Sequence, residues 1–297
     1  MAVTALYRYP VKSMLGESLR ACRIDAGGVL GDRAYAVIDI ETGTVASAKV
    51  PRRWAALLDF SARYVTEPLA GEPVPPVEIT FPDGSVLRSD GPGVDDALSA
   101  VLARPVRLVS TRPERSAEGR WGFEELWPDI DGLAPQGLID GTRVRREETG
   151  EAISRFDVAG MAPGSTGFFD LAVLHVLTEA TLDRLRELAP EATFDVRRYR
   201  PNLVLDGDDA GFVENGWPGR AITLGDGPRL EVSITAMRCV MTTLAQGDLP
   251  ADADTLRAIA QHNRLEIPGM GVWACAGVYA DVAAGGSVSV GDAYVVS

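Results

Sequence analysis

Short runs of alternating apolar and polar residues recur along the chain and predict closely spaced β-strands. Val3–Tyr9 and Leu230–Thr235 alternate with the two-residue period of a half-buried strand, and Ala34–Ile40 is a further strand candidate. Thr42-Gly43 and Pro82-Asp83-Gly84 carry the turn residues that hairpins require. The pattern therefore predicts a mainly β protein.

Helical spacing is confined to a few segments. Apolar residues recur at helical intervals in Val94–Leu102, Glu179–Leu188 and Asp254–Asn263, and a short helix is expected after Pro51. Thr178 stands where an N-cap residue would begin the second of these helices. The fold class is predicted to be α+β, mainly β with some α, and the second half is expected to form a closed or nearly closed barrel with helices at its ends.

Both patterns break down between residues 111 and 136, where charged residues, prolines and glycines interleave with aromatics. We interpret this segment as an irregular connection between a smaller β-rich domain, 1–110, and a second domain, 137–297. Its aromatics either cover a cleft or form a satellite core cluster. At the end of the chain, strands on either side of Gly291-Asp292 are expected to pair as a hairpin.

Composition narrows the classes of function. The chain has 297 residues, 46% of them apolar, and a formal net charge of −13, which disfavours a nucleic-acid-binding face. Three cysteines and two histidines form neither a CxxC pair nor an H-x-x-x-H pattern, so a zinc site is not indicated. The N-terminus lacks the apolar stretch of a signal peptide and no run reaches membrane-spanning length, so we expect a cytoplasmic protein without a membrane span.

Cys239 is the cysteine with candidate chemistry. It follows the predicted strand Leu230–Thr235 and stands directly after Arg238. A neighbouring cation favours the thiolate, which attacks electrophiles or binds a soft metal. The alternative is a small buried hydrophobic residue, and we assign that structural role to Cys22 and Cys275.

An ordered set of short motifs spans the chain. The set consists of Tyr9-Pro10-Val11-Lys12-Ser13, Gly31-Asp32-Arg33, Arg198-Tyr199-Arg200-Pro201-Asn202-Leu203, Arg238-Cys239 and the closing Gly286–Asp292. In this order they resemble the MOSC superfamily, named for the C-terminal domain of molybdenum cofactor sulfurases, with the β-barrel domain that commonly precedes it. The functional analogue is the mitochondrial amidoxime-reducing component and its bacterial relatives.

The resemblance implies a molybdenum cofactor, in which a pterin dithiolene and one protein cysteine hold the metal. Cys239 is the matching metal ligand. The pterin carries a phosphate, so the resemblance also implies cationic and hydrogen-bonding residues around it. The matching positions are Lys12, Ser13, Arg33, Thr178, Arg200, Asn202, Arg238 and Tyr279.

Several of these residues have a plain structural alternative. Lys12 could be a solvated loop charge, and Arg200 could pair with an acid such as Asp195. Asn202 could serve only a turn, and Thr178 could cap its helix without any bound anion.

The implied activity is reduction of N-hydroxylated small molecules to the N–H compound by a molybdenum oxidoreductase. The chain lacks the cysteines of an iron–sulfur cluster, so a separate electron donor of ferredoxin, flavodoxin or cytochrome type is expected. Residues 244–248 differ from the usual family sequence after the cysteine, so we expect the substrate side of the pocket to differ from that of the family. The alternative is a carrier of the cofactor or of sulfur, with Cys239 holding a persulfide and no reductase turnover.

Overall fold

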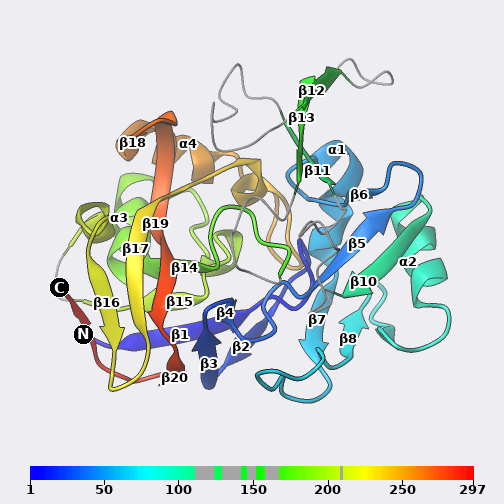
Figure 1. The fold of residues 1–297 in the computed structure, drawn as a ribbon. Coiled ribbons are helices and arrows are strands. Elements are labelled where there is room, and N and C mark those ends of the chain that lie inside the picture. The colour runs from blue at the N-terminus through cyan, green and yellow to red at the C-terminus, as the bar shows by residue number, and fades with distance from the viewer. Residues whose placement is uncertain (111–123, 129–141, 146–151, 158–166, 208–209) are drawn as a thin grey trace. The chain divides into compact units, whose positions relative to one another are not determined.

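The computed structural model describes residues 1–110, 124–128, 142–145, 152–157, 167–207 and 210–297. The chain folds into two compact units that interleave in sequence. Unit 1 consists of Met1–Arg8, Ser18–Leu30 and Leu171–Ser297, and unit 2 of Tyr9–Glu17 and Gly31–Asp170. Figure 1 shows the elements of both, and each unit is described by itself below.

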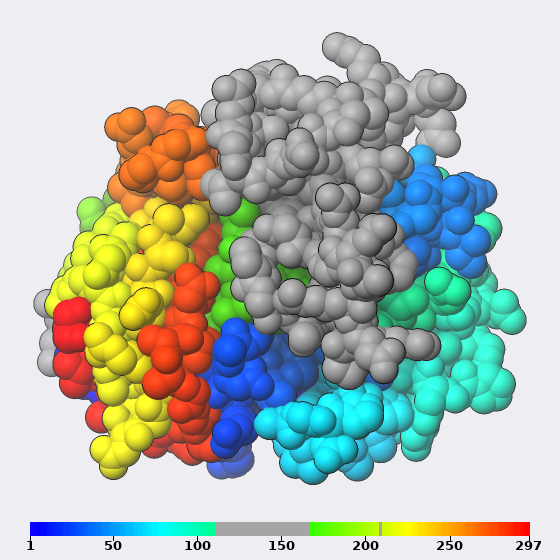
Figure 2. All heavy atoms as spheres, viewed as in Figure 1, coloured from blue at the N-terminus to red at the C-terminus, as the bar shows by residue number. Residues whose placement is uncertain are grey.

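Unit 1 is built on a nine-stranded sheet. In spatial order the strands are β2 (Glu17–Leu19), β1 (Val3–Arg8), β15 (Leu203–Leu205), β14 (Leu174–Thr178), β19 (Gly271–Ala284), β17 (Arg229–Met237), β16 (Ala221–Leu224) and β21 (Tyr294–Val296), with β18 (Arg264–Ile267) also paired to β19. Every residue of β14 is buried, including the polar His175 and Thr178, because the strand lies at the centre of the sheet. β17 alternates exposed and buried residues over its first half. In Figure 2 the atoms of β16, β17 and β19, in yellow to red, adjoin one another across one face of this unit.

In the described part of unit 1, two helices and three short 3₁₀ turns accompany this sheet. They are α3 (Glu179–Leu188), α4 (Asp254–His262), η3 (Val196–Arg198), η4 (Val213–Gly216) and η5 (Val240–Thr243). Leu182 and Leu185, on the apolar side of α3, pack in one core cluster with Ile259 of α4 and Tyr199. A small separate sheet contains β20 (Gly286–Ser289), β3 (Ala21–Asp25) and β4 (Gly28–Val29).

Unit 2 contains two sheets around its own core. One has the order β10 (Val106–Ser110), β5 (Tyr35–Asp39), β6 (Thr44–Val45), β11 (Glu124–Pro128), β13 (Ala152–Asp157) and β12 (Thr142–Arg145), and the other joins β7 (Ser61–Tyr64), β8 (Val77–Thr80) and β9 (Val86–Arg88). The helices are α1 (Pro51–Trp54), η1 (Ala55–Asp59) and α2 (Val94–Leu102). Trp54, Leu57 and Leu98 meet in the core, which confirms the amphipathic pattern of these short segments.

The fold class is confirmed, but two strand arrangements differ from expectation. The path of the large sheet ends at β2 and β21, and no closed barrel is found among the described strands, although an isolated bridge joins Ala2 to Ala293. The predicted closing hairpin is wrong, because β20 pairs with β3 while β21 pairs with β16. These distant pairings bury Val288 and Tyr294, which a two-stranded hairpin alone could not do.

The segment 111–136 is not wholly irregular. Glu124–Pro128 forms β11, which pairs with β6 and β13. The rest of the segment, with the proposed flap or satellite cluster of aromatics, lies outside the described residues. The consecutive domain boundaries 1–110 and 137–297 stay a prediction. Among the described residues, no helix has the length and apolar character needed to span a membrane.

Candidate functional site

Cys239 lies at the junction between β17 and η5. Its backbone is extended, and it forms the N-terminal boundary of η5. Its carbonyl oxygen accepts hydrogen bonds from the backbone N–H and the hydroxyl of Thr242, at 3.2 Å and 3.0 Å. Cys239 is partly exposed, whereas Cys22 and Cys275 are buried, as predicted for structural cysteines. Of the three thiols, that of Cys239 is therefore the most open to a ligand.

Arg238 is directed into the fold of unit 1. Its guanidinium donates to Nε2 of His175 at 3.0 Å, to the carbonyl of Ala276 at 3.3 Å and to the carbonyl of Tyr199 at 3.2 Å. Because an arginine only donates, Nε2 of His175 accepts, and the neutral ring carries its proton on Nδ1. Arg238 thus joins β14, β19 and the segment after η3 immediately before the cysteine.

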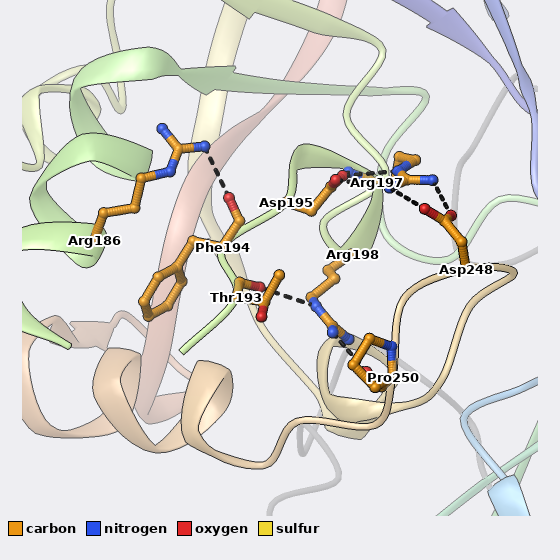
Figure 3. A network of polar contacts seen from close by, with 8 residues as sticks. All are labelled: Arg186, Thr193, Phe194, Asp195, Arg197, Arg198, Asp248 and Pro250. Atoms are coloured by element: carbon orange, nitrogen blue, oxygen red, sulfur yellow. Dashed lines mark hydrogen bonds and ion pairs between the residues drawn. The ribbon is translucent and has the colours of Figure 1, made fainter. Parts of the chain in front are cut away.

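A second arginine holds the segment that follows the cysteine. Arg198 is 1% exposed, and its guanidinium donates to the carbonyl oxygens of Thr193 at 3.0 Å, Leu244 at 3.0 Å and Pro250 at 2.6 Å. Figure 3 shows Arg198 between Thr193 and Pro250, while its neighbour Arg197 points to acidic side chains instead. Backbone carbonyls around a buried cation satisfy its donors and fix their own loop. Arg198 therefore positions the turn that begins at Cys239.

Asn202 and Arg200 precede β15. Asn202 accepts from the backbone N–H of His175 at 3.1 Å through its side chain and donates to the carbonyl of Tyr7 at 3.4 Å. It therefore bridges β14 and β1, which is a structural role different from the turn considered for it. Arg200 is 8% exposed and adopts a left-handed φ of 53°. Asp195, the acid considered as its partner, forms an ion pair with Arg197.

Thr178 caps α3, as predicted, and its hydroxyl is already engaged. Its oxygen accepts from the backbone N–H of Thr181 at 3.1 Å, and its hydrogen is donated to Glu214 at 2.7 Å. Thr181 donates to the same carboxylate oxygen at 2.7 Å. Burial raises the pKa of Glu214, although these hydrogen bonds counteract that effect. The acidic group beside the start of α3 is thus supplied by the protein, and the contact of Thr178 with a cofactor stays a prediction.

Tyr279 lies opposite His175 in the pairing of β14 with β19, with their ring centroids 5.7 Å apart. Gly277, two residues earlier, has a φ of 87°. A Cβ atom there would approach His175 Nε2 to 2.3 Å and the carbonyl oxygen of Val176 to 2.6 Å. The glycine therefore lets β19 come close enough for the contacts of His175.

In unit 2, the loop Tyr9–Ser13 is fixed by backbone hydrogen bonds to the segment around Arg33 and Tyr35. The N–H of Tyr9 donates to Asp32 at 2.7 Å, and the N–H of Arg33 donates to the carbonyl of Tyr9 at 2.7 Å. Ser13 has a φ of 65°, and its hydroxyl oxygen accepts from the N–H of Ala48 at 3.1 Å. The first two motifs recognised in the sequence are therefore adjacent in space.

Lys12 is buried rather than solvated. Its ammonium donates to the carbonyl of Phe168 at 3.0 Å and to Oδ1 of Asp170 at 2.6 Å. Lys49 approaches the same oxygen at 2.5 Å. Burial alone would raise the pKa of Asp170, but the attraction of Lys12 and Lys49 outweighs it and lowers that pKa.

Arg33 completes the cationic part of unit 2. It forms an ion pair with Asp32, and its guanidinium carbon lies 5.0 Å from the ring centroid of Tyr9 and 5.8 Å from that of Phe169. Burial opposes its charge, but Asp32 and further neighbours, including Asp170, raise its pKa. This guanidinium is therefore kept charged between aromatic rings.

Backbone strain coincides with the predicted cofactor-binding residues. Among the described residues, four that are not glycine have positive φ, namely Ser13, Arg33, Ala103 and Arg200. The motif resemblance had selected three of these without any knowledge of backbone angles. Such conformations cost of the order of 1 kcal/mol or more and collect at ligand-binding positions. The strain is thus independent support for a ligand-binding role of these positions.

Sequence reasoning missed residues whose importance depends on burial. Arg198 was only part of a motif, His175 matched no pattern, and Glu214 was not considered. Lys49 was noticed only as one of two lysines. That scarcity was a usable signal, because the two lysines meet at one carboxylate.

Comparisons with known proteins agree with the motif resemblance. Residues 164–295 match the MOSC domain, and residues 1–66 match the MOSC N-terminal beta barrel domain. No curated protein matched the chain.

Solved structures give weak likenesses. The YuaD protein from Bacillus subtilis has 11% sequence identity and a TM-score of 0.43, with 99% of this chain and 94% of that chain covered. YiiM from Geobacillus stearothermophilus has 16% identity and a TM-score of 0.30, with 54% of this chain and 72% of that chain covered. Neither likeness is strong enough to bear on the function.

Proposed function

The chain belongs to the MOSC-domain proteins, with a MOSC N-terminal β-barrel domain before its MOSC domain, and from this membership we propose that it is a molybdenum-cofactor oxidoreductase. Its substrates would be small N-hydroxylated compounds such as amidoximes and hydroxylamines. Two electrons and two protons convert their N–OH group to N–H and water. The electrons would come from a separate donor protein of ferredoxin, flavodoxin or cytochrome type.

Cys239 would be the protein ligand of the metal. A thiolate is a soft ligand of the kind that molybdenum takes in such cofactors. The thiol is partly exposed and stands at the start of η5, with the preceding residue anchored to His175 and the following turn anchored by Arg198. A ligand held from both sides suits a site in which one side chain must fix the metal's position.

The remaining predicted residues would bind the pterin and its phosphate. These residues are Lys12, Ser13, Arg33, Thr178, Arg200, Asn202, Arg238 and Tyr279. The observation that supports this assignment best is the left-handed backbone of Ser13, Arg33 and Arg200. When bound, the cofactor supplies a metal that accepts oxygen from the substrate. The protein supplies cationic donors for the phosphate and a fixed thiolate.

The test is molybdenum content after expression with an intact cofactor pathway. Wild-type protein should contain the metal, Cys239→Ala should lose it, and Cys22→Ala should keep it as a control at a buried cysteine. Reduction of benzamidoxime with an artificial electron donor then reports turnover. Metal-loaded protein without turnover would favour the carrier function instead, and wild-type protein that never binds molybdenum would refute both cofactor hypotheses.

A further inference from the structure

A small apolar cluster of unit 1 keeps several of its side chains partly exposed. Its buried members are Ile267, Met270 and Cys275, and the partly buried side chains packed against them are Ile234, Met237, Leu265 and Trp273. These residues lie on β17, β18 and β19, where β19 pairs with both other strands, and on the turn between β18 and β19 (Figure 1). A partly open apolar surface next to a few polar or reactive groups is typical of small-molecule binding sites.

The backbone register between β17 and β19 continues past the last residue of β17. Met237, at the end of β17, is paired with β19, and the next hydrogen bond runs from the N–H of Arg238 to the carbonyl of Ala274, at 2.8 Å. The backbone of the following residue is still extended. The antiparallel register therefore brings Cys239, the residue after Arg238, opposite Trp273, the residue before Ala274.

The alternation of side chains places the thiol on the face of the apolar cluster. Side chains along an extended chain point to opposite faces in turn. The guanidinium of Arg238 lies on the face of His175, so Cys239 shares the opposite face with Met237. Trp273 belongs to the same cluster as Met237. The proposed metal ligand therefore has partly exposed apolar side chains on its own side of the sheet.

The indole of Trp273 is held in place from within unit 1. Its Nε1–H donates to the carbonyl of Met270 at 2.6 Å, so the polar atom is satisfied and the ring surface is the part that a ligand can contact. Met237 adds an unbranched side chain that adapts to different shapes and packs well against aromatic rings. Such a surface favours an aromatic or other apolar group over a polar one.

We propose that Met237 and Trp273 form the apolar wall of the substrate site, and that the substrates are N-hydroxylated compounds with an aromatic or bulky apolar group close to the N–OH group. The inference rests on the proposed function, because Cys239 must hold the metal at which the N–OH group reacts. The apolar group then lies against Met237 and Trp273. Compounds without such a group, such as hydroxylamine itself, gain nothing from this wall.

The test compares benzamidoxime with acetamidoxime, which has the same reacting group but a methyl group in place of the phenyl ring. The measured quantity is the ratio of their kcat/KM values, with metal-loaded protein and an artificial electron donor. Trp273→Ala and Met237→Gln should each lower this ratio about fivefold or more, whereas Met237→Leu, which keeps an apolar side chain, should retain it. Phe212→Ala is the control, because it removes a partly buried aromatic ring from another cluster of unit 1.

A merely structural role would change kcat/KM for both compounds by the same factor. An unchanged ratio in either variant therefore removes that residue from the wall, and an unchanged ratio in both overturns the inference. If Trp273→Ala does not fold, Met237→Gln decides. Loss of molybdenum from folded Trp273→Ala protein would assign the wall to the cofactor instead of the substrate, and would also overturn the inference.

A binding measurement separates this inference from the proposed function. In metal-free protein, benzamidoxime should shift the NMR signal of the Trp273 indole N–H, which is identified by its loss in Trp273→Phe, and acetamidoxime at the same concentration should not. That shift, together with metal-loaded protein that reduces neither amidoxime, would keep the apolar site and reject the reductase. Reduction of both amidoximes, with no shift and an unchanged ratio in the variants, would keep the reductase and reject the apolar wall.

Discussion

Replacing Arg198 by methionine should destabilise unit 1 and loosen the turn that carries Cys239. Methionine keeps an unbranched apolar side chain but removes every donor. The carbonyl oxygens of Thr193, Leu244 and Pro250 would then lose the guanidinium that binds them at 2.6–3.0 Å. Figure 3 shows that Thr193 and Pro250 come from separate segments, so the loss also disconnects the chain before η3 from the loop after η5.

The expected cost follows from these three contacts. A hydrogen bond to a charged group contributes about 1.5–3 kcal/mol, and no further penalty for buried carbonyls is added because Thr193 and Pro250 are exposed residues whose carbonyls can bind water instead. Removing the buried charge recovers part of its desolvation penalty. Because the contacts share one side chain they do not add fully, and we expect Arg198→Met to lower the free energy of unfolding by about 3–5 kcal/mol.

Urea unfolding of metal-free protein measures this change, and the labelling rate of Cys239 under native conditions measures the loosened turn. Arg197→Met is the matched control, because the adjacent Arg197 is 40% exposed and its ion pairs with Asp195 and Asp248 lie at the surface. Loss of these surface ion pairs should lower the free energy of unfolding by less than about 1 kcal/mol. Equal costs for the two variants, or an unchanged labelling rate in Arg198→Met, would refute the positioning role.

Three further predictions concern buried groups. Burial raises the pKa of Glu214, so the stability that its protonated form contributes is complete below its unfolded pKa and is lost as pH rises through its folded pKa. In urea unfolding, wild type should therefore lose stability relative to Glu214→Gln as pH rises from about 4 to 7. A stability difference that stays constant with pH would contradict this. Among the residues that the structure describes, none is a hydrogen-bond partner of the buried Tyr199 hydroxyl. Tyr199→Phe should therefore be neutral or stabilise by up to about 1 kcal/mol, and a clear loss in thermal unfolding would show that the hydroxyl is used. Gly277→Ala should lower the free energy of unfolding by more than about 2 kcal/mol and disturb the His175 ring signals in NMR, because the added methyl group meets the backbone as well as the ring. Gly219→Ala is the control, since Gly219 also has a positive φ but has open space around its Cβ position.

Local patterns predicted the elements well where neighbours in sequence decide the structure. The helices Val94–Leu102 and Glu179–Leu188 have the predicted limits, and the hairpin around Pro82-Asp83-Gly84 forms as expected. The pairing of β20 and β21 was not predictable in the same way. A turn at Gly291-Asp292 is compatible with either arrangement, and the choice depends on which distant strand, β3 or β16, is available.

The candidate site was predictable as a set of motif positions but not as a set of interactions. Thr178 was recognised as an N-cap, yet the sequence does not show that Glu214 takes up its hydroxyl hydrogen. Asp170 likewise has no motif around it, although it binds both lysines. Motif order therefore selects candidate positions whose role in cofactor binding stays a prediction, because their free bonding capacity depends on long-range partners.

The Arg238-Cys239 pair shows why adjacency in sequence is a limited guide. Successive side chains of an extended chain point to opposite faces, and the guanidinium of Arg238 donates to His175 and to two carbonyls of unit 1. The effect of Arg238 on the charge of the Cys239 thiol stays a prediction, but its structural role follows from these hydrogen bonds. Arg238 anchors the backbone just before Cys239, and Arg198 anchors the turn just after it. Both anchors are needed because η5 is a single short turn whose own hydrogen bonds cannot fix the direction of the thiol.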